Sequence, residues 1–423
     1  MAFRFVHAAD IHLDSPLRSL AMRNRDLADL VNNASRRAFI SIIDLCLDEQ
    51  ADALIIAGDL YDGEQTSMKT ARFLAEQLLR LDQAGIKTFI IRGNHDALSK
   101  ITKELTLPES VKLFGHRAEA ISFERPKGKT PIFIHGLSFA KPQAPESLLG
   151  KYKALIDGAV NIGLMHTSLD GTFGHDLYAP CSVKDLQNSG FQYWGLGHIH
   201  KRAAILHKNN VIVMPGIPQG RDINEAGPKS VTLVTVGDDK TIEIEERFTS
   251  IAQFERIELS VNGLTDWRTM VEHFGKVFER ARSNTDAEHL IMRLNLSGTT
   301  PLAWQVRRDI DILQADLELY ATPDKRSWIE KIEVNCIPPS LGTAQANDPL
   351  IELRGLISDD ILDSGGFAQY AADLAKELQK DLPQECRNIF GKDEAAVKAA
   401  LQSLAKVGTD DVLARLQAQA AEI

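Results

Sequence analysis

The chain has 423 residues, of which 44% are hydrophobic, so it can bury one large core and support one or two smaller domains. Its formal net charge of −10 argues against a free-standing nucleic-acid-binding protein, because Lys and Arg supply most of the non-specific affinity for phosphate. No stretch approaches the roughly 18–20 apolar residues of a membrane helix, and residues 1–6 have the pattern of a strand rather than of a signal peptide. The four cysteines form no C-x-x-C pair. We therefore expect a cytoplasmic protein with reduced thiols and no membrane association.

Five short apolar runs are each followed by residues that can bind metal ions. The runs are residues 3–9, 53–57, 88–91, 162–165 and 193–196, and each is short enough to be a buried strand. The sequences that follow them are D-x-H, G-D, G-N-H-D, a lone His and G-H-x-H. Because ligands and catalytic groups gather at the carboxyl ends of strands in open α/β sheets, we expect these side chains to lie together.

Seven of these residues form the expected ligand set of two divalent metal ions. We assign one ion to Asp10, His12 and His200 and the other to Asn94, His166 and His198. Asp59 is the candidate bridge, because Gly58 permits a tight turn that offers the carboxylate to both ions. Oxygen and imidazole donors without a thiolate suit Mn²⁺, Mg²⁺, Fe²⁺ or Zn²⁺ and argue against a structural zinc site. Two such ions can share a bridging hydroxide that attacks a phosphate ester.

The segments between and after these strands predict a layered α/β core. Residues 27–48 and 67–84 have helical patterns, which gives β-α-β-α-β alternation. After the G-H-x-H sequence come four short strand patterns without helices between them, at residues 203–206, 211–214, 230–236 and 241–246. We expect these strands to pair in antiparallel fashion and to complete a second sheet behind the site. The expected catalytic domain spans residues 1–250.

Two further regions follow the catalytic domain. Residues 251–339 have a β-α-β-α-β pattern and are interpreted as a small capping domain. Residues 340–423 are interpreted as a linker and a helical C-terminal region, in which the segment from residue 348 onward carries −6 of the net charge of −10. Its apolar stripe is compatible with packing on its own chain, which is the commoner fate of an amphipathic helix, or with docking of a partner.

The order of these motifs resembles that of the calcineurin-like metallophosphoesterases. The motifs are D-x-H at Asp10, G-D at Asp59, G-N-H-D at Asn94, the lone His166 and G-H-x-H at His198. The chain is similar to their DNA-repair exonuclease branch of SbcD type, and most similar to its YhaO-like members. The resemblance implies a layered β-sandwich core flanked by helices, with a small α/β cap and a helical C-terminal tail. It implies hydrolysis of DNA phosphodiester bonds, as an exonuclease or end-processing nuclease, with two divalent ions, of which Mn²⁺ is expected first.

The resemblance also suggests roles beyond the metal ligands. His95 would act as general acid to the leaving oxygen or as a donor to the phosphate, and Asp62 would orient it. Asp62 is equally compatible with a plain loop in which it accepts backbone hydrogens. The arginine that follows this aspartate in related phosphoprotein phosphatases is absent here, which counts against that activity. Arg202 and Arg221 are the expected DNA contacts because of their positions.

Relatives of this branch work with an SMC-like ATPase of SbcC type, so the resemblance implies such a partner, bound through the C-terminal helices. The sequence does not decide the oligomeric state, and a homodimer is one alternative. The two alternatives to a nuclease are a phosphatase or phosphodiesterase for a small nucleotide-like substrate, and a non-catalytic scaffold. The capping region is larger than a small substrate needs, and a scaffold would usually have lost ligands, whereas all seven are present.

Overall fold

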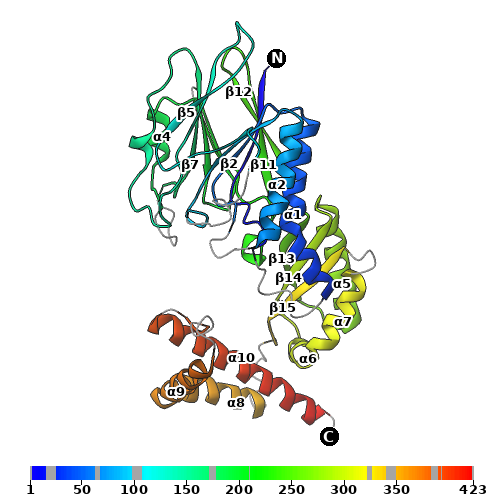
Figure 1. The fold of residues 1–423 in the computed structure, drawn as a ribbon. Helices are drawn as coiled ribbons and strands as arrows, with labels where there is room; N and C mark the ends of the chain where they lie inside the picture. Colours follow the sequence, from blue (N-terminus) through cyan, green and yellow to red (C-terminus); the bar gives the residue numbers. More distant parts are fainter. Residues whose placement is uncertain are drawn as a thin grey trace. The chain divides into compact units, whose positions relative to one another are not determined.

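A computed structural model of the chain describes residues 2–15, 25–61, 67–97, 107–170, 178–208, 210–321, 326–339, 349–382, 389–391 and 393–421 (Figure 1). The chain divides into two compact units. The first consists of Met1–Arg256, Arg282–Met292 and Arg326–Glu330, and the second of Ile257–Ala281, Arg293–Lys325 and Lys331–Ile423.

The first unit contains a six-stranded sheet in the order β12-β11-β1-β2-β3-β4. These strands are β1 (Phe3–Ala8), β2 (Ala53–Ala57), β3 (Lys87–Ile91), β4 (Val111–Leu113), β11 (Ser230–Val236) and β12 (Ile242–Phe248). Strands β1 to β4 run parallel, and β11 pairs antiparallel with both β1 and β12. Helices α1 (Arg25–Asp48) and α2 (Met68–Gln83) cover one face through an apolar cluster that includes Ile42, Leu54 and Leu78.

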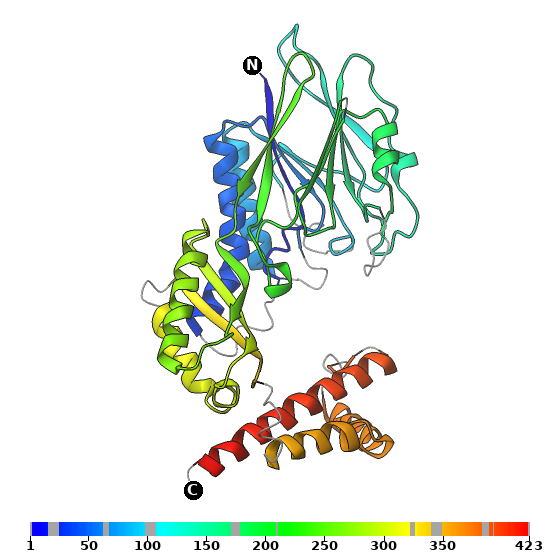
Figure 2. The ribbon, with the colours of Figure 1, turned by 180° about the vertical axis from the view of Figure 1, so that it is seen from behind.

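A second six-stranded sheet has the order β5-β6-β7-β8-β10-β9. Its strands are β5 (Glu119–Phe123), β6 (Ile132–Gly136), β7 (Val160–His166), β8 (Tyr193–Gly197), β9 (Ala203–His207) and β10 (Asn210–Met214). Phe5 and Ile55 of the first sheet share a buried cluster with Ile134 and Ile162 of the second, so the sheets form a sandwich. Helix α4 (Val183–Asn188) packs outside the second sheet, as Figure 2 shows from behind.

The five strands expected to precede the metal ligands are all present as β1, β2, β3, β7 and β8, and the expected helices are α1 and α2. The expectation that the four later strands complete a single second sheet is wrong. β9 and β10 join β8, where β10 pairs parallel with β8 and antiparallel with β9. β11 and β12 join β1 instead. The reason is burial: β11 contributes Val231 to the core under the helices and Val234 to the core between the sheets, so it needs cover on both faces.

A three-stranded sheet has the order β13-β14-β15, with strands β13 (Ala252–Ser260), β14 (His289–Thr299) and β15 (Ser327–Ile337). Helix α5 (Trp267–Ser283) joins β13 to β14 in the chain, as expected. The second helix of the expected β-α-β-α-β pattern is instead two helices, α6 (Ala303–Arg308) and α7 (Ile310–Ala321). The break is at Asp309, a poor interior helix residue, whose carboxylate accepts from Arg308.

The described residues from 349 onward contain four helical segments: α8 (Pro349–Leu356), a π-helix η4 (Ile357–Leu362), α9 (Gly365–Asp381) and α10 (Glu394–Ala421). Within the second unit, α10 lies against α6, where Arg307 is 3.5 Å from Asp410 and Leu413 is buried. The last helix therefore packs on its own chain. Among the helices in the described part of the chain, none is long and apolar enough to cross a membrane.

Candidate dinuclear metal site

The seven expected ligands lie at the carboxyl ends of five strands from both sheets. Asp10 and His12 follow β1, Asp59 follows β2, Asn94 follows β3, His166 ends β7, and His198 and His200 follow β8. Because β1, β2, β3, β7 and β8 are the neighbouring parallel strands of each sheet, their ends meet at one edge of the sandwich. The structure brings all seven residues together there.

The ligand atoms form two groups. In the first group, atoms of Asp10, His12 and His200 all lie within 4.8 Å of one another, and the two Nε2 atoms of the histidines are 3.2 Å apart. The second group consists of Asp59, His166 and His198, again within 4.8 Å. Asn94 joins the second group, since its Oδ1 lies 2.9 Å from Nε2 of His166. The groups adjoin, because Asp10 Oδ1 lies 3.9 Å from Nδ1 of His166.

Four of the ligands have left-handed backbone conformations that non-glycine residues rarely adopt. The φ angles are 51° at Asp10, 44° at His12, 49° at Asp59 and 103° at His198. Such conformations cost about 1–3 kcal/mol each and are retained where the surrounding structure requires them. Their concentration at the strand ends shows that the chain places these side chains at some cost to its own stability.

The glycines of the metal-binding sequences permit close approach of the loops. A Cβ atom on Gly93 would lie 2.2 Å from Oδ1 of Asp59, and one on Gly58 would lie 2.4 Å from Nδ1 of His166. Gly58 also has a φ angle of 95°, which a side chain would strain. These two positions therefore need glycine for the ligands to pack side by side.

Hydrogen bonds orient the ligands. The backbone N–H of His198 donates to both carboxylate oxygens of Asp10, at 3.0 and 2.9 Å, and that of His95 donates to Asp59 at 3.0 Å. Nδ1 of His166 lies 3.0 Å from the carbonyl oxygen of Ala57. If that nitrogen carries the proton, Nε2 is left to face the other ligands. Metal-binding histidines commonly have such a partner on the ring nitrogen that does not bind the ion.

The electrostatics of the site reflect strong coupling between buried groups. Burial alone would raise the pKa of Asp59, but the adjacent His166 outweighs burial and holds that pKa well below its usual range. Burial would lower the pKa of His166, but Asp59 raises it to about 9. Burial raises the pKa of Asp10. The charge on the buried Asp59 carboxylate thus depends on the cationic His166, and a bound metal ion would provide positive charge beside it in the same way.

This donor set fits two divalent ions. It offers buried carboxylates, an amide oxygen and imidazoles, with no cysteine in either group. Such ligands suit Mn²⁺, Mg²⁺, Fe²⁺ and Zn²⁺ in sites that leave a position open for substrate.

Three side chains near the ligands were not recognised from the sequence. Glu225 contacts His200, with Oε1 2.6 Å from Nδ1. Tyr178 lies edge-on to His198 with ring centroids 5.1 Å apart, and Phe139 lies edge-on to His166 at 5.6 Å. No short sequence pattern marks these residues, because each reaches the site from a loop far from the ligand it touches.

Asp96 was also not recognised as part of the site. Its two oxygens accept from the backbone N–H of Leu60, at 3.0 Å, and from that of Gly93, at 2.6 Å. Asp96 therefore ties the G-D loop to the G-N-H-D loop. The Asp at the end of G-N-H-D was the available signal, but the sequence does not say which loop it would reach.

The remaining predicted site residues have different surroundings. The exposed imidazole of His95 lies beside His12, with ring centroids 5.0 Å apart, so it sits next to the first ligand group. Asp62 lies outside the described residues. Arg202 donates to Thr232 at 2.7 Å and pairs with Glu246 at 3.4 Å. Arg221 pairs with Glu225 at 2.9 Å. Both arginines thus engage groups of the protein itself.

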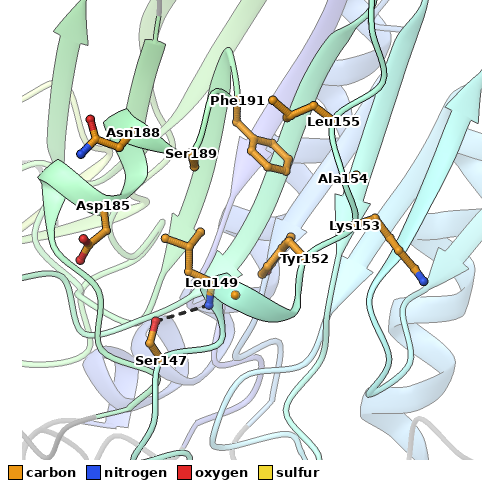
Figure 3. A pocket seen from close by; sticks show the side chains of 11 residues that line it. Ser147, Leu149, Tyr152, Lys153, Ala154, Leu155, Asp185, Asn188, Ser189 and Phe191 are labelled. Carbon is orange, nitrogen blue, oxygen red and sulfur yellow. Dashed lines mark hydrogen bonds between the residues drawn. The ribbon is translucent and has the colours of Figure 1, made fainter.

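A pocket of about 570 Å³ elsewhere in the first unit contains none of these residues (Figure 3). It is lined by Tyr152, Lys153, Asp185 and Phe191 among others. The candidate site is therefore identified by its donor atoms and not by the size of a cavity.

Comparison with known proteins agrees with the geometry. Residues 3–202 match the calcineurin-like phosphoesterases, and residues 254–337 match the middle domain of the metallophosphoesterase YhaO. The chain is 32% identical over 298 residues to the uncharacterized metallophosphoesterase YhaO of Bacillus subtilis (strain 168), which covers 70% of the chain and 72% of that protein. The chain belongs to the calcineurin-like metallophosphoesterases. Within this family it is YhaO-like.

Archaeal repair proteins are further relatives of this YhaO-like metallophosphoesterase. It is 24% identical to the DNA double-strand break repair protein Mre11 of Archaeoglobus fulgidus, over 94% of the chain and 93% of that protein. It is 27% identical to the protein of the same name from Sulfurisphaera tokodaii, over 51% of the chain and 54% of that protein.

Proposed function

We propose that this metallophosphoesterase hydrolyses DNA phosphodiester bonds, as an exonuclease or end-processing enzyme in DNA repair. The observation that carries the proposal is the convergence of Asp10, His12 and His200 with Asp59, His166 and His198 into two adjoining ligand groups. DNA as the substrate is supported by similarity to proteins named for DNA double-strand break repair, one of them along 94% of the chain.

Two bound ions would activate a water molecule and hold the attacking and leaving oxygens of the ester. The chain's own contribution is to hold the ligands in place and to supply proton transfer. His95 is suited to the second task, because its exposed ring adjoins the first ligand group while its backbone N–H is fixed by Asp59. We assign to His95 the transfer of a proton to the leaving oxygen.

The proposal is tested with the purified full-length chain and Mn²⁺, on end-labelled single- and double-stranded DNA. Free nucleotides and a bis-aryl phosphodiester are assayed in parallel. We expect metal-dependent release of nucleotides from DNA. Hydrolysis of the nucleotides or the aryl ester with intact DNA would instead show a small-molecule phosphodiesterase, and no hydrolysis of any substrate would show a scaffold.

We further propose that the C-terminal helices bind an SMC-like ATPase. The apolar residues Tyr370, Leu374 and Leu378 recur every fourth position along α9 and are 68%, 47% and 51% exposed. Such a stripe is the feature that a coiled-coil partner contacts.

Replacing Tyr370, Leu374 and Leu378 by Ser should abolish co-purification with the ATPase while Mn²⁺-dependent hydrolysis of the aryl ester persists. Leu206→Ser, at a residue 68% exposed on β9, is the matched control, and unchanged co-purification of the triple variant would refute the proposal.

A further inference from the structure

Glu225 is the last residue of a short 3₁₀ helix, η2 (Ile223–Glu225), in the loop between β10 and β11. Its Oε1 lies 2.6 Å from Nδ1 of His200, and its side chain is only 13% exposed. A carboxylate in this position accepts the Nδ1 proton and leaves Nε2 of His200 without one. That Nε2 is the atom that faces His12 at 3.2 Å in the first ligand group.

Arg221 holds the Glu225 carboxylate from the other side. Its backbone N–H donates to Oε2 at 2.8 Å, and its guanidinium donates to Oε1 at 2.9 Å. One guanidinium nitrogen is also 3.2 Å from Nδ1 of His200. Nδ1 cannot donate to Glu225 and accept from Arg221 at once, and the shorter contact, to a charged acceptor, favours donation to Glu225.

The loop that carries Glu225 is itself anchored. Gln219, only 3% exposed, accepts from the backbone N–H of Ile251 at 2.8 Å and donates to the carbonyl oxygen of Ala252 at 2.7 Å. Asp222 accepts from the N–H of Asn224 at 2.7 Å and caps η2. The carboxylate therefore has little freedom to leave His200.

We propose that Glu225 is a positioning residue for the first ligand group, fixing the ring orientation and tautomer of His200, and that Arg221 acts on Glu225 rather than on DNA. This inference rests on the proposed metal site but not on the identity of the substrate. Outer partners of metal-binding histidines typically contribute about 10–100-fold to metal affinity.

The test is calorimetric titration of the metal-free full-length protein with Mn²⁺, in the absence of any substrate. In Glu225→Ala we expect one of two sites to weaken by about 10–100-fold and the other to keep its affinity. Glu225→Gln should fall between this variant and the wild type, because its amide oxygen still accepts from Nδ1 but carries no charge. Glu243→Ala is the matched control: it removes an exposed carboxylate on β12 that belongs to neither ligand group, and both sites should keep their affinity.

Thermal unfolding of each metal-free variant shows whether it folds. If Glu225→Ala is unfolded, the nearly isosteric Glu225→Gln decides the question. Equal affinity in wild type and Glu225→Gln, or equal weakening of both sites, overturns the positioning role. Failure of the wild type to bind Mn²⁺ refutes the metal site and hence both proposals, whereas two Mn²⁺ sites without DNA hydrolysis refute only the substrate.

Discussion

Both carboxylate oxygens of Asp59 have a neighbour in the site: Oδ2 lies 3.3 Å from Nε2 of His166, and Oδ1 accepts from the N–H of His95. Asp59→Asn should abolish hydrolysis of every phosphoester and lower the bound metal below two ions per chain, because a neutral amide bridges two cations poorly. Elemental analysis and aryl ester hydrolysis measure both effects. Asp157→Asn, at an exposed loop position, should change neither. Full metal occupancy with wild-type activity in Asp59→Asn would refute the bridging role.

Replacing His95 should impair the chemical step without affecting metal binding. In His95→Ala we expect kcat to fall by about 10²–10⁴-fold with little change in KM, because only proton transfer in the transition state is lost. Metal content should equal that of the wild type. His207→Ala, at an exposed position on β9, is the control for loss of an imidazole. Loss of metal from His95→Ala would make His95 a ligand and contradict its assigned role.

The sequence could predict that the seven candidate ligands lie together because each one ends or closely follows a buried strand, so that local order along the chain predicts where it lies. Glu225 was not predicted as part of the site because it lies 25 residues beyond His200, and two further strands separate the two residues in the chain. Arg221 was expected to contact DNA on position alone. Its contacts with Glu225, through both the backbone N–H and the guanidinium, could be seen only in the structure.

At the scale of elements, the loop after β3 controls the spacing of the ligand groups. Gly93→Ala would place a Cβ about 2.2 Å from Oδ1 of Asp59, so the loop or the ligand must move. We expect turnover to fall by about 10²-fold or more, as a shift of about 1 Å near reacting groups can cause. Gly115→Ala is the control, because its Cβ would lie 4.0 Å from Oε1 of Glu119, which is an ordinary contact distance. Kinetics of the two variants check this, and equal activity would show that the glycine is not required.

The contact between β1 and β8 predicts a pH dependence of stability. His7 is fully buried between them, with Nδ1 2.9 Å from the hydroxyl of Tyr193, and burial lowers its pKa to about 3. In the unfolded chain the pKa of this histidine is about 6.5, so between pH 6.5 and 3 only the unfolded chain binds the proton. The free energy of unfolding therefore falls by about 1.4 kcal/mol per pH unit as the pH drops from 6.5 towards 3, and this histidine has no effect on it above pH 6.5. Unfolding of wild type and His7→Gln across this range measures it. Equal slopes would refute the assignment.

The strands that precede the candidate ligands were predictable because apolar runs mark them, but β4, β5 and β6 were not predicted, and neither was the sheet that each later strand joins. β10 pairs with β8 and β11 with β1, although only a short loop and η2 separate β10 from β11. Pairing is decided by which face each strand must bury, which depends on contacts far along the chain. The break between α6 and α7 has a local cause at Asp309, but Asp inside a helical pattern is too common to predict a break by itself.

At the scale of the whole molecule, net charge gave the least information about function. The charge of −10 argued against nucleic acid, yet the candidate site gathers its buried carboxylates where two cations would offset them. The sequence left open whether the acidic C-terminal region packs on its own chain or docks a partner. Within the second unit, α10 packs on α6 through Arg307 and Asp410, a contact between segments that no local pattern relates.

The most direct measurement is anomalous diffraction from crystals of the full-length chain grown with Mn²⁺. Two peaks should appear, one within coordination distance of Asp10, His12 and His200 and the other within coordination distance of Asn94, His166 and His198, with Asp59 contacting both. A single peak, or peaks away from these seven residues at saturating Mn²⁺, would contradict the dinuclear site.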